Sequence, residues 1–329
     1  MPEANAAPRA SILLIAYKAA DTIRAAIDGA LAQTVFCEIL ISDDGSPDDT
    51  FAVAQAHVAG YAGPHQLVVR RNEPNQGVTE HLNTLMRMAR GQVLVVMAGD
   101  DISKPARIAE TLQAFDADPS LYVLGAAVDE IDMQGAPLRS GVRHMPGHFD
   151  LRWFARAGKM ATLLGATIAF RRELFDRFGP LAGSVEDNVL TLRGALLGGG
   201  RCLETPLVWY RQNPQSLGNW LFARGDKSPG AFRKRYQRTI KMYRAIADDL
   251  ERCVAMVPDL ASTQAAHAAR IIGIYRLEAE AREAILDKPR SQWLGPIWRG
   301  LKHPGLRRKS AERALKLFLP RRLFGITTK

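Results

Sequence analysis

The chain has 329 residues, of which 47% are hydrophobic, so it can form one large α/β domain with an added segment, or two ordinary domains. Its three cysteines, Cys37, Cys202 and Cys253, form no Cys-x-x-Cys pair, which argues against a disulfide framework and against a cysteine zinc site. The N-terminus lacks a signal-peptide pattern, and no window approaches the roughly 18 consecutive apolar residues of a membrane span. We therefore expect a cytoplasmic protein.

The formal net charge of +10 is concentrated near the C-terminus. Between residues 299 and 329 there are ten Lys or Arg side chains and one acid, Glu312, which gives this segment a charge of +9. The rest of the chain is nearly neutral, so its charge does not indicate a polyanionic partner.

Short apolar runs rich in Val, Ile and Leu alternate with amphipathic segments of helical length in the N-terminal part of the chain. This alternation predicts βαβ units and an open, mostly parallel α/β sheet flanked by helices. The expected strands are 11–16, 38–42, 66–70 and 93–98, and the expected helices are 20–33, 47–59 and 78–89.

Farther along the chain the order of elements is looser, and a polar break follows at 224–230. After this break, apolar residues recur at helical spacing. They are Tyr236, Ile240, Tyr243, Ile246, Leu250 and Val254. We therefore expect a domain at 1–222 and a helical C-terminal extension at 223–329, of which 293–329 is basic and amphipathic.

Aspartates gather where the second expected strand ends. Ser46-Pro47-Asp48-Asp49 fits a helix start with serine as the N-cap, proline at the first helical position and acid in the first turn. Asp43 and Asp44 precede this cap at the carboxyl end of the strand, where ligands bind in open α/β sheets. A solvated turn is the alternative for Asp43 and Asp44, and we favour ligand contact.

A second acidic pair, Asp100 and Asp101, follows an apolar run and Gly99, which allows close approach of the backbone. Adjacent carboxylates repel each other, so placing them at one sheet edge favours a divalent cation that joins them. Mg²⁺ or Mn²⁺ binds such oxygens and fills its other positions with phosphate oxygens and water. The pair predicts a phosphorylated substrate, whereas a helix-start cluster before Ser103 would explain Asp101 alone.

A third acidic pair, Glu186 and Asp187, follows Ser184. Ser184 and Asp187 have the spacing of a capping box, which is a purely structural role. A carboxylate at a helix start can also take a proton from an acceptor hydroxyl if it is aimed at the substrate. From the residues alone, both interpretations of Asp187 stay open.

Several spaced motifs follow one another in a fixed order. They are SILLIAYKAADTIRAAIDGALAQT, ILISDDGSPDDT, NQGVTEHLN, GQVLVVMAGDDISKPARI, GATIAFRRELFDRFG, VEDNVLTLRGALLGG and YRQNPQS. Over residues 10–217 this series resembles glycosyltransferase family 2. The resemblance implies a GT-A fold and an inverting, metal-dependent, hexosyltransferase-like enzyme. Such an enzyme moves a sugar from a nucleotide-diphosphate sugar to a glycan or lipid-linked acceptor, as in cell-surface polysaccharide synthesis.

The resemblance also implies where the substrates bind. Asp43 or Asp44 would contact the nucleotide base or ribose, and Ala16 and Tyr17 would belong to the same nucleotide site. Residues 165–167 would form a loop on the acceptor side. The basic candidates for contact with the diphosphate are Arg70, Arg71 and Arg211.

In the same resemblance, Asp100 and Asp101 would form the metal-binding motif, with Asp100 also next to the donor, and Asp187 would be the catalytic base. Two positions depart from the family pattern. The frequent first acid of the metal motif is Ala98 here, and the frequent histidine of Tyr-Arg-x-His is Asn213. Asn213 offers an amide oxygen in place of an imidazole and is a candidate metal ligand.

Two other classes of protein are alternatives. A nucleotidyltransferase would share the sheet and the metal carboxylates, but no Gly-rich phosphate-binding loop follows the first strand. A non-catalytic binder of membrane surfaces or polyanions would explain the basic segment but not three acidic pairs. A dinucleotide-dependent oxidoreductase is not expected, because no G-x-G-x-x-G follows a strand.

The basic C-terminal segment predicts an anionic membrane surface as a partner, on the inner face of the membrane. Trp293 and Trp298 are typical of an interface, and Ala311, Leu315 and Phe318 share one face of an expected helix. The basic residues of this segment include Arg308, Lys309, Arg313, Lys316, Arg321 and Arg322. Packing of the helix on the body is the alternative, and without a recognisable nucleic-acid-binding module we expect no nucleic-acid partner.

Overall fold

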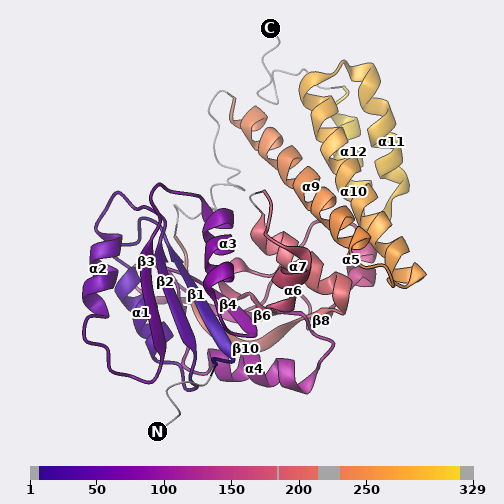
Figure 1. The fold of residues 1–329 in the computed structure, drawn as a ribbon. Coiled ribbons are helices and arrows are strands. Elements are labelled where there is room, and N and C mark those ends of the chain that lie inside the picture. The colour runs from indigo at the N-terminus through magenta and orange to yellow at the C-terminus, as the bar shows by residue number, and fades with distance from the viewer. Residues whose placement is uncertain (1–6, 184, 214–229, 319–329) are drawn as a thin grey trace. The chain divides into compact units, whose positions relative to one another are not determined.

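The computed structural model describes residues 7–183, 185–213 and 230–318 (Figure 1). The chain divides into two compact units, an N-terminal unit of 1–150 and 162–213 and a C-terminal unit of 151–161 and 214–329. The domain boundary predicted near residue 222 lies outside the described residues. The short segment 151–161, which we placed in the first domain from the sequence, groups with the C-terminal unit.

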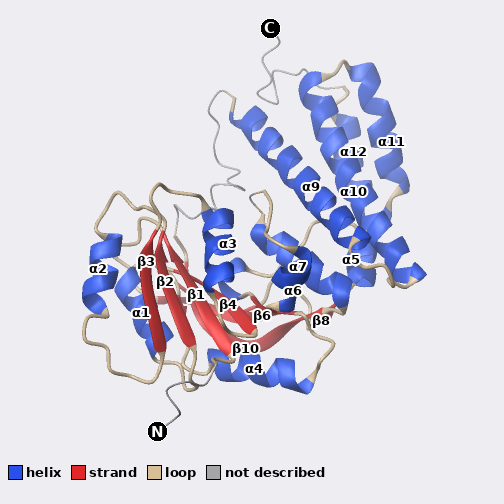
Figure 2. Cartoon of the chain, viewed as in Figure 1, coloured by secondary structure: helices blue, strands red, loops and turns tan. Residues whose placement is uncertain are grey.

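The described part of the N-terminal unit is built on one ten-stranded sheet (Figure 2). The strand order is β3-β2-β1-β4-β9-β6-β10-β5, with β7 beside β6 and β8 beside β10. The strands are β1 (Ala10–Ala16), β2 (Glu38–Asp43), β3 (Gln66–Arg71), β4 (Val93–Ala98), β5 (Ile102–Ser103), β6 (Val123–Ile131), β7 (Pro137–Val142), β8 (His148–Phe149), β9 (Ala169–Arg171) and β10 (Gly200–Arg211). β1 to β4 pair in parallel, as do β6 and β10, whereas β5, β7, β8 and β9 are antiparallel to their neighbours.

Helices flank this sheet because its strands carry apolar side chains on both faces. The helices are α1 (Ile23–Leu31), α2 (Thr50–His57), α3 (Val78–Met88), α4 (Arg107–Ala117), α6 (Glu173–Phe178) and α7 (Glu186–Leu197), with a 3₁₀ turn η1 (Gly165–Thr167). Ile12 and Leu14 of β1 belong to one buried cluster with Ile27 of α1 and Ile108 of α4. Leu13 points to the opposite face and is also fully buried. Burial on both faces explains the continuous apolar runs.

The four predicted strands are confirmed to within one residue at each end, and the three predicted helices are confirmed with shorter ranges. One helix start is wrong. The helix expected from Pro47 begins at Thr50, with Asp49 at the N-cap position. Ser46 accepts a hydrogen bond from Lys18 N at 2.9 Å and donates one to Asp43. Its hydroxyl therefore joins two loops, and it does not cap α2.

The described part of the C-terminal unit is helical. Its elements are α5 (Leu151–Ala157), α9 (Ala231–Ala255), α10 (Ser262–Asp287), η2 (Arg290–Trp293), α11 (Leu294–Lys302), η3 (Pro304–Leu306) and α12 (Arg307–Leu315). α9 packs on α10, where the rings of Tyr243 and Tyr275 meet edge to face with centroids 5.6 Å apart. Ile240, Ile246 and Leu250 are buried with Tyr243, which confirms the predicted helical periodicity. None of the described helices has the length and apolar character needed to cross a membrane.

A buried cluster of charges holds α12 on α10. Glu278 is 1% exposed and accepts hydrogen bonds from Arg313 at 2.7 and 3.1 Å and from Arg282 at 2.5 Å. Lys309 Nζ lies 3.5 Å from the same carboxylate. Burial alone would raise the pKa of Glu278, but these cations lower it to about 2. The cluster therefore holds a carboxylate ionised inside the helical unit.

Two predictions for the basic C-terminal segment are wrong. Trp293 is 1% exposed and belongs to the core of the helical unit, so it does not lie at a membrane interface. Arg313 is 5% exposed because it pairs with Glu278, and its charge is not available to an external partner. Arg321 and Arg322 lie outside the described residues.

Candidate active site

Loops tie the carboxyl ends of β1, β2 and β4 together at one edge of the sheet. Asp44 N donates to Ala16 O at 2.8 Å, and Gly99 N donates to Ile15 O at 2.8 Å. A Cβ atom at position 99 would lie 2.9 Å from Ala16 Cβ, so this approach requires glycine. Ala16 therefore lies where the three strand ends meet, and the adjacent Tyr17 is 48% exposed.

Asp44 organises the loop that follows β3. Its carboxylate is 3% exposed and accepts hydrogen bonds from Asn72 Nδ2 at 2.7 Å, Gln76 N at 3.0 Å and Gly77 N at 2.9 Å. Gly77 has a φ of +78° and immediately precedes α3. Asp44 thus fixes the start of α3 at the edge of the sheet, and its contact with a nucleotide stays a prediction.

Asp43 and Arg71 form a second set of loop contacts. Asp43 is 2% exposed, accepts hydrogen bonds from Ser46 N at 3.0 Å and from the Ser46 hydroxyl, and lies 3.3 Å from Arg71 Nε. Arg71 also donates to Ser46 O at 2.8 Å. Arg70 turns away from this group and donates to Ser42 Oγ at 2.8 Å. Contact of Arg71 with a diphosphate stays a prediction.

His81, a buried histidine of α3 under this edge, was not predicted from the sequence. It is 2% exposed, and its Nε2 lies 2.7 Å from Ser42 Oγ. Burial, together with the positive charge of Arg70, lowers the pKa of His81 to about 4, although Asp44 and Asp43 oppose the shift. His81 is therefore neutral near pH 7. Its partner is 39 residues away, so local sequence carried no signal for this contact.

The structure brings Asp100, Asp101 and Asn213 together from segments more than 100 residues apart. Arg211 N donates to Asp101 Oδ1 at 2.8 Å, and Asn213 Nδ2 donates to Asp100 Oδ2 at 3.2 Å. Arg211 Nε also donates to Asp100 O at 2.9 Å. Asp101 is 2% exposed, and burial followed by the charge of Asp100 raises its pKa well above the usual range.

The donor set of this site fits a hard divalent cation. Two carboxylates and the amide oxygen of Asn213 are ligands that Mg²⁺ and Mn²⁺ prefer, and a cation would offset the repulsion that raises the pKa of Asp101. Among the described residues, no group of three or more His, Cys, Asp and Glu side chains could hold a metal ion. Mg²⁺ commonly keeps several waters and binds substrate phosphates besides one or two carboxylates.

Asp187 lies at the start of α7. The helix begins at Glu186 with Val185 at the N-cap position, so Asp187 is the second helical residue and does not take the third helical position that a capping box requires. Ser184 itself lies outside the described residues. Asp187 Oδ1 accepts hydrogen bonds from Asn188 N at 2.7 Å and Asn188 Nδ2 at 2.9 Å. Burial raises the pKa of Asp187, which strengthens it as a base.

Two contacts connect this acidic pair to its surroundings. Glu186 Oε2 lies 3.5 Å from Thr79 Oγ1 at the start of α3. A Cβ atom on Gly165 of η1 would lie 3.9 Å from Asp187 Cβ, so the loop predicted for the acceptor side does adjoin Asp187. Burial, and next the charge of Asp187, raises the pKa of Glu186 to about 7. This perturbed Glu186 carboxyl was not predicted from the sequence.

Comparisons with known proteins identify the family of this chain. The family model described as glycosyl transferase family 2 matches residues 11–179, just over half of the chain. The chondroitin synthase of Escherichia coli is 32% identical over 135 residues, which cover 41% of this chain and 19% of that protein. The chain spans less than two thirds of the length of the first curated relatives it matches.

Two solved structures share the fold. The crystal structure of S. aureus TarS 1-349 in complex with UDP-GlcNAc has a TM-score of 0.59 and 15% identity, and covers 97% of this chain and 88% of that one. The mannosyltransferase PcManGT from Pyrobaculum calidifontis, in complex with GDP-Man and Mn²⁺, has a TM-score of 0.51 and 17% identity, and covers 98% of this chain and 84% of that one. At these identities the likeness establishes the fold alone, and it confirms the predicted GT-A sheet with a helical C-terminal extension.

Proposed function

Because this chain belongs to glycosyl transferase family 2, we propose that it transfers a sugar from a nucleotide-diphosphate sugar to a hydroxyl of a glycan or lipid-linked acceptor. The reaction is a single displacement that inverts the anomeric carbon. The observation that carries this proposal is the convergence of Asp100, Asp101 and Asn213 at the carboxyl ends of the strands. The likeness to a chondroitin synthase supports polysaccharide synthesis as the setting.

The donor nucleotide would lie over the edge that Ala16, Tyr17 and Asp44 form. Asp100 and Asp101, with the amide oxygen of Asn213, would hold Mg²⁺ or Mn²⁺ next to the diphosphate. When bound, the ion would neutralise the negative charge that builds on the departing diphosphate. PcManGT, a protein of the same fold, was solved in complex with GDP-Man and Mn²⁺, which supports this assignment.

Asp187 would act as the general base. Its carboxylate takes the proton of the acceptor hydroxyl while the hydroxyl oxygen bonds to the anomeric carbon, and the bond from that carbon to the diphosphate breaks. Because burial raises the pKa of Asp187, the carboxylate holds a proton better than an exposed aspartate. Inversion in one step requires no enzyme nucleophile.

Metal-dependent binding of a nucleotide diphosphate tests the donor site. We expect UDP or GDP to bind in the presence of Mn²⁺ and to lose affinity in EDTA, as measured by calorimetry. Asp101→Asn keeps an oxygen that can accept from Arg211 N but removes the charge, so it should abolish the Mn²⁺ effect. The matched control is Asp116→Asn, whose side chain is 59% exposed in a surface ion pair. Equal affinities in Mn²⁺ and EDTA would contradict the proposal.

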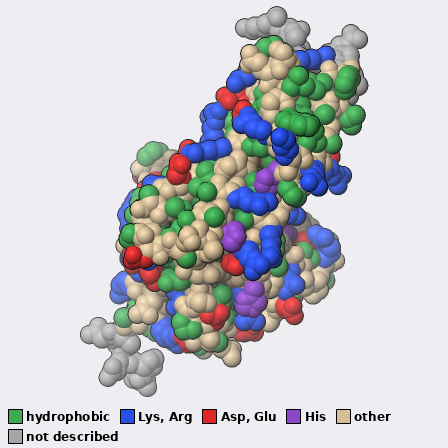
Figure 3. Space-filling view, turned by 90° about the vertical axis from the view of Figure 1, so that its right-hand side faces the viewer, with side chains coloured by type: hydrophobic (Ala, Val, Ile, Leu, Met, Phe, Trp, Pro, Cys, Tyr) green, Lys and Arg blue, Asp and Glu red, His purple; other side chains and the backbone are tan. Residues whose placement is uncertain are grey.

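We also propose that the C-terminal unit docks on an anionic membrane surface, where a lipid-linked acceptor would be found. Figure 3 shows hydrophobic side chains beside Lys and Arg on this unit. Leu294 and Trp298 of α11 are 57% and 61% exposed. Leu315, the last residue of α12, is 66% exposed, and Phe318, three residues beyond that helix, is 84% exposed. Lys302 Nζ lies 5.1 Å from the Trp298 ring centroid.

Several features of this surface match a bilayer face. An interfacial segment combines aromatic and aliphatic side chains with Lys and Arg, and each cation contributes about 1 kcal/mol near an anionic leaflet. The exposed Lys302 and Arg307 supply charge, whereas Lys309 and Arg313 are directed to Glu278. The attraction is therefore smaller than the formal charge of the segment suggests, and it should be reversible by salt.

Co-sedimentation with vesicles tests this docking. The full chain should sediment with vesicles of phosphatidylglycerol and phosphatidylcholine at low salt, and should stay in solution with phosphatidylcholine alone. Trp298→Ala should weaken sedimentation, whereas Met256→Ala, at a residue that is 42% exposed elsewhere in the unit, should not. If the full chain stays in the supernatant over anionic vesicles at low salt, the docking proposal is wrong.

A further inference from the structure

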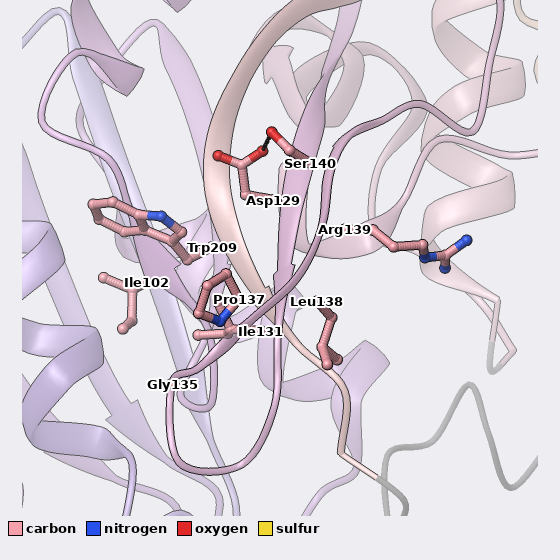
Figure 4. Close-up of a pocket in the computed structure, with 9 residues that line it drawn as sticks. All are labelled: Ile102, Asp129, Ile131, Gly135, Pro137, Leu138, Arg139, Ser140 and Trp209. Carbon is pink, nitrogen blue, oxygen red and sulfur yellow. Dashed lines mark hydrogen bonds between the residues drawn. The ribbon is translucent and has the colours of Figure 1, made fainter.

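A cavity of about 470 Å³ opens on the N-terminal unit among β5, β6, β7 and β10 (Figure 4). Its wall is mainly apolar. Trp209 and Ile102 lie beside each other in the close-up, Pro137 and Ile131 face them, and Arg139 extends away. This volume falls within the range of roughly 300–1,000 Å³ that is typical of small-molecule sites.

Strand register explains why these side chains meet. Trp209 of β10 pairs with Ile102 of β5 on one side and with Asp129 of β6 on the other, so the three residues form a row across the sheet. Directly paired residues project from the same face of a sheet. Ile102 directly follows Asp101, and Arg211 lies two residues beyond Trp209 on the same strand face. The cavity therefore shares its strands with the candidate metal site.

Two residues that line the cavity, Asp129 and Ser140, belong to a polar cluster with Lys104 at its rim. Lys104 Nζ lies 2.5 Å from Asp129 Oδ2 and 5.1 Å from the centroid of the Trp209 ring. Ser140 Oγ donates to Asp129 Oδ1 at 2.5 Å. Among the residues that the structure describes, none accepts a hydrogen bond from the Trp209 indole nitrogen. An aromatic face, an indole donor and a paired charge thus border one apolar cavity.

Arg211 connects this cavity to the acidic pair. Its Nη1 donates to Asp132 O at 3.0 Å and to Met133 O at 2.8 Å, in the turn between β6 and β7 that leads to Gly135 on the cavity wall. Its Nε donates to Asp100 O at 2.9 Å. One guanidinium group therefore holds both the cavity wall and the backbone of the metal motif.

We propose that this cavity is a subsite for one pyranose ring of the acceptor glycan, an assignment that rests on the proposed glycosyltransferase function. A pyranose has an apolar C–H face and a hydroxyl-bearing edge. The C–H face packs on the Trp209 indole, and the hydroxyls meet the rim of Lys104, Asp129 and Ser140. An alkyl chain would remove water from the Lys104–Asp129 pair and would offer no hydrogen bonds in place of those lost. Its binding there is therefore unfavourable.

The binding test uses methyl β-glucoside, methyl β-galactoside and methyl N-acetyl-β-glucosaminide as probes. A single ring in an open cavity should bind at millimolar concentration, and saturation-transfer NMR detects such binding. We expect at least one probe to bind the full chain. Binding of none of them, when UDP binds with Mn²⁺, refutes the subsite and leaves the proposed function standing. Absence of UDP binding as well would count against the proposed function itself.

Substitutions of Trp209 distinguish stacking of the sugar ring on an aromatic side chain from simple contact with an apolar side chain. Trp209→Leu keeps an apolar side chain without an aromatic face and should weaken probe binding at least about tenfold, whereas Trp209→Phe should lose less. Leu138→Lys places a long charged side chain at a cavity residue that is 53% exposed and should block the probe. Met88→Lys, at a residue that is 40% exposed in α3, is the matched control and should bind normally.

Binding of UDP with Mn²⁺ is measured on each variant and should stay within about threefold of wild type, which shows that the fold and donor site survive. Full probe binding by Trp209→Leu would contradict stacking on the indole. Octanol is the comparison probe for an apolar-chain site. If octanol binds the cavity and displaces the glycosides, while Trp209→Leu retains octanol, the cavity holds alkyl chains and the proposal is wrong.

Discussion

Replacing Glu186 with Gln should remove a pH dependence from the stability of the N-terminal unit. Burial, and next the charge of Asp187, raises the pKa of Glu186 from 4.5 to about 7 in the folded protein. The folded state therefore binds this proton more tightly than the unfolded chain does. By linkage, the stabilisation is fully present below pH 4.5, the unfolded value, and is lost as the pH rises through about 7.

The size of the effect follows from these two values. The difference between 4.5 and about 7 corresponds to about 3 kcal/mol, at roughly 1.4 kcal/mol for each pH unit. For a folded unit of about 200 residues, that free energy corresponds to a change in melting temperature of roughly 6–12 °C. Glu186→Gln stays neutral at every pH and should not show this change.

Thermal unfolding at about pH 5 and pH 8 measures the effect. The difference in melting temperature between the two pH values should be larger in wild type than in Glu186→Gln, by most of the amount given above, because a pH of about 5 lies just above the unfolded pKa of 4.5. Glu204→Gln is the control, because its side chain is 87% exposed. If wild type and Glu186→Gln lose stability in parallel as the pH rises, the pKa of Glu186 is not raised in the folded protein.

Three further predictions concern other sites. Glu278→Gln should destabilise the C-terminal unit by about 3–5 kcal/mol in calorimetry, because it leaves Arg313 buried without an anion. In wild type this stabilisation is lost as the pH falls from 4.5 toward about 2. An unchanged melting temperature of the variant would argue against the cluster. Asn213→Ala should weaken Mn²⁺ binding about tenfold in the presence of UDP, because it removes an amide oxygen of the kind that Mn²⁺ prefers, and unchanged Mn²⁺ affinity would remove Asn213 from the site. Asp44→Ala should destabilise the fold by about 2–4 kcal/mol and abolish UDP binding, because Gly77 N and its neighbours lose their acceptor; normal UDP affinity would contradict this.

The strands of the N-terminal unit could be predicted because their signal is local. Both faces of 93–98 are buried, so the sequence is a continuous apolar run that ends at Gly99, and the observed β4 has the same limits. Two of the acidic pairs, Asp43 with Asp44 and Asp100 with Asp101, could be recognised because they follow such runs. The fixed order of several motifs then indicated the family, which the match over 11–179 confirms.

Contacts between distant residues could not be predicted from local patterns. Arg313 looked like part of an exposed basic face, but its partner Glu278 lies 35 residues away on another helix and draws it inside. Trp293 looked interfacial because it is aromatic and near basic residues, yet the C-terminal unit uses it as a core side chain. Ser46 fits the N-cap pattern, but the nearby Asp43 carboxylate competes for its hydroxyl.

Turnover of a nucleotide sugar by Asp187→Asn tests the central claim most directly. The assay follows release of nucleotide diphosphate from UDP-glucose, UDP-GlcNAc and GDP-mannose with Mn²⁺, with Asp176→Asn, at a 55% exposed side chain, as control. Asparagine keeps the shape of Asp187 but accepts no proton, so we expect the rate to fall about 10²- to 10⁴-fold while donor affinity stays within about threefold of wild type. If wild type releases nucleotide diphosphate and the Asp187→Asn variant releases it at a nearly equal rate, Asp187 is not the base.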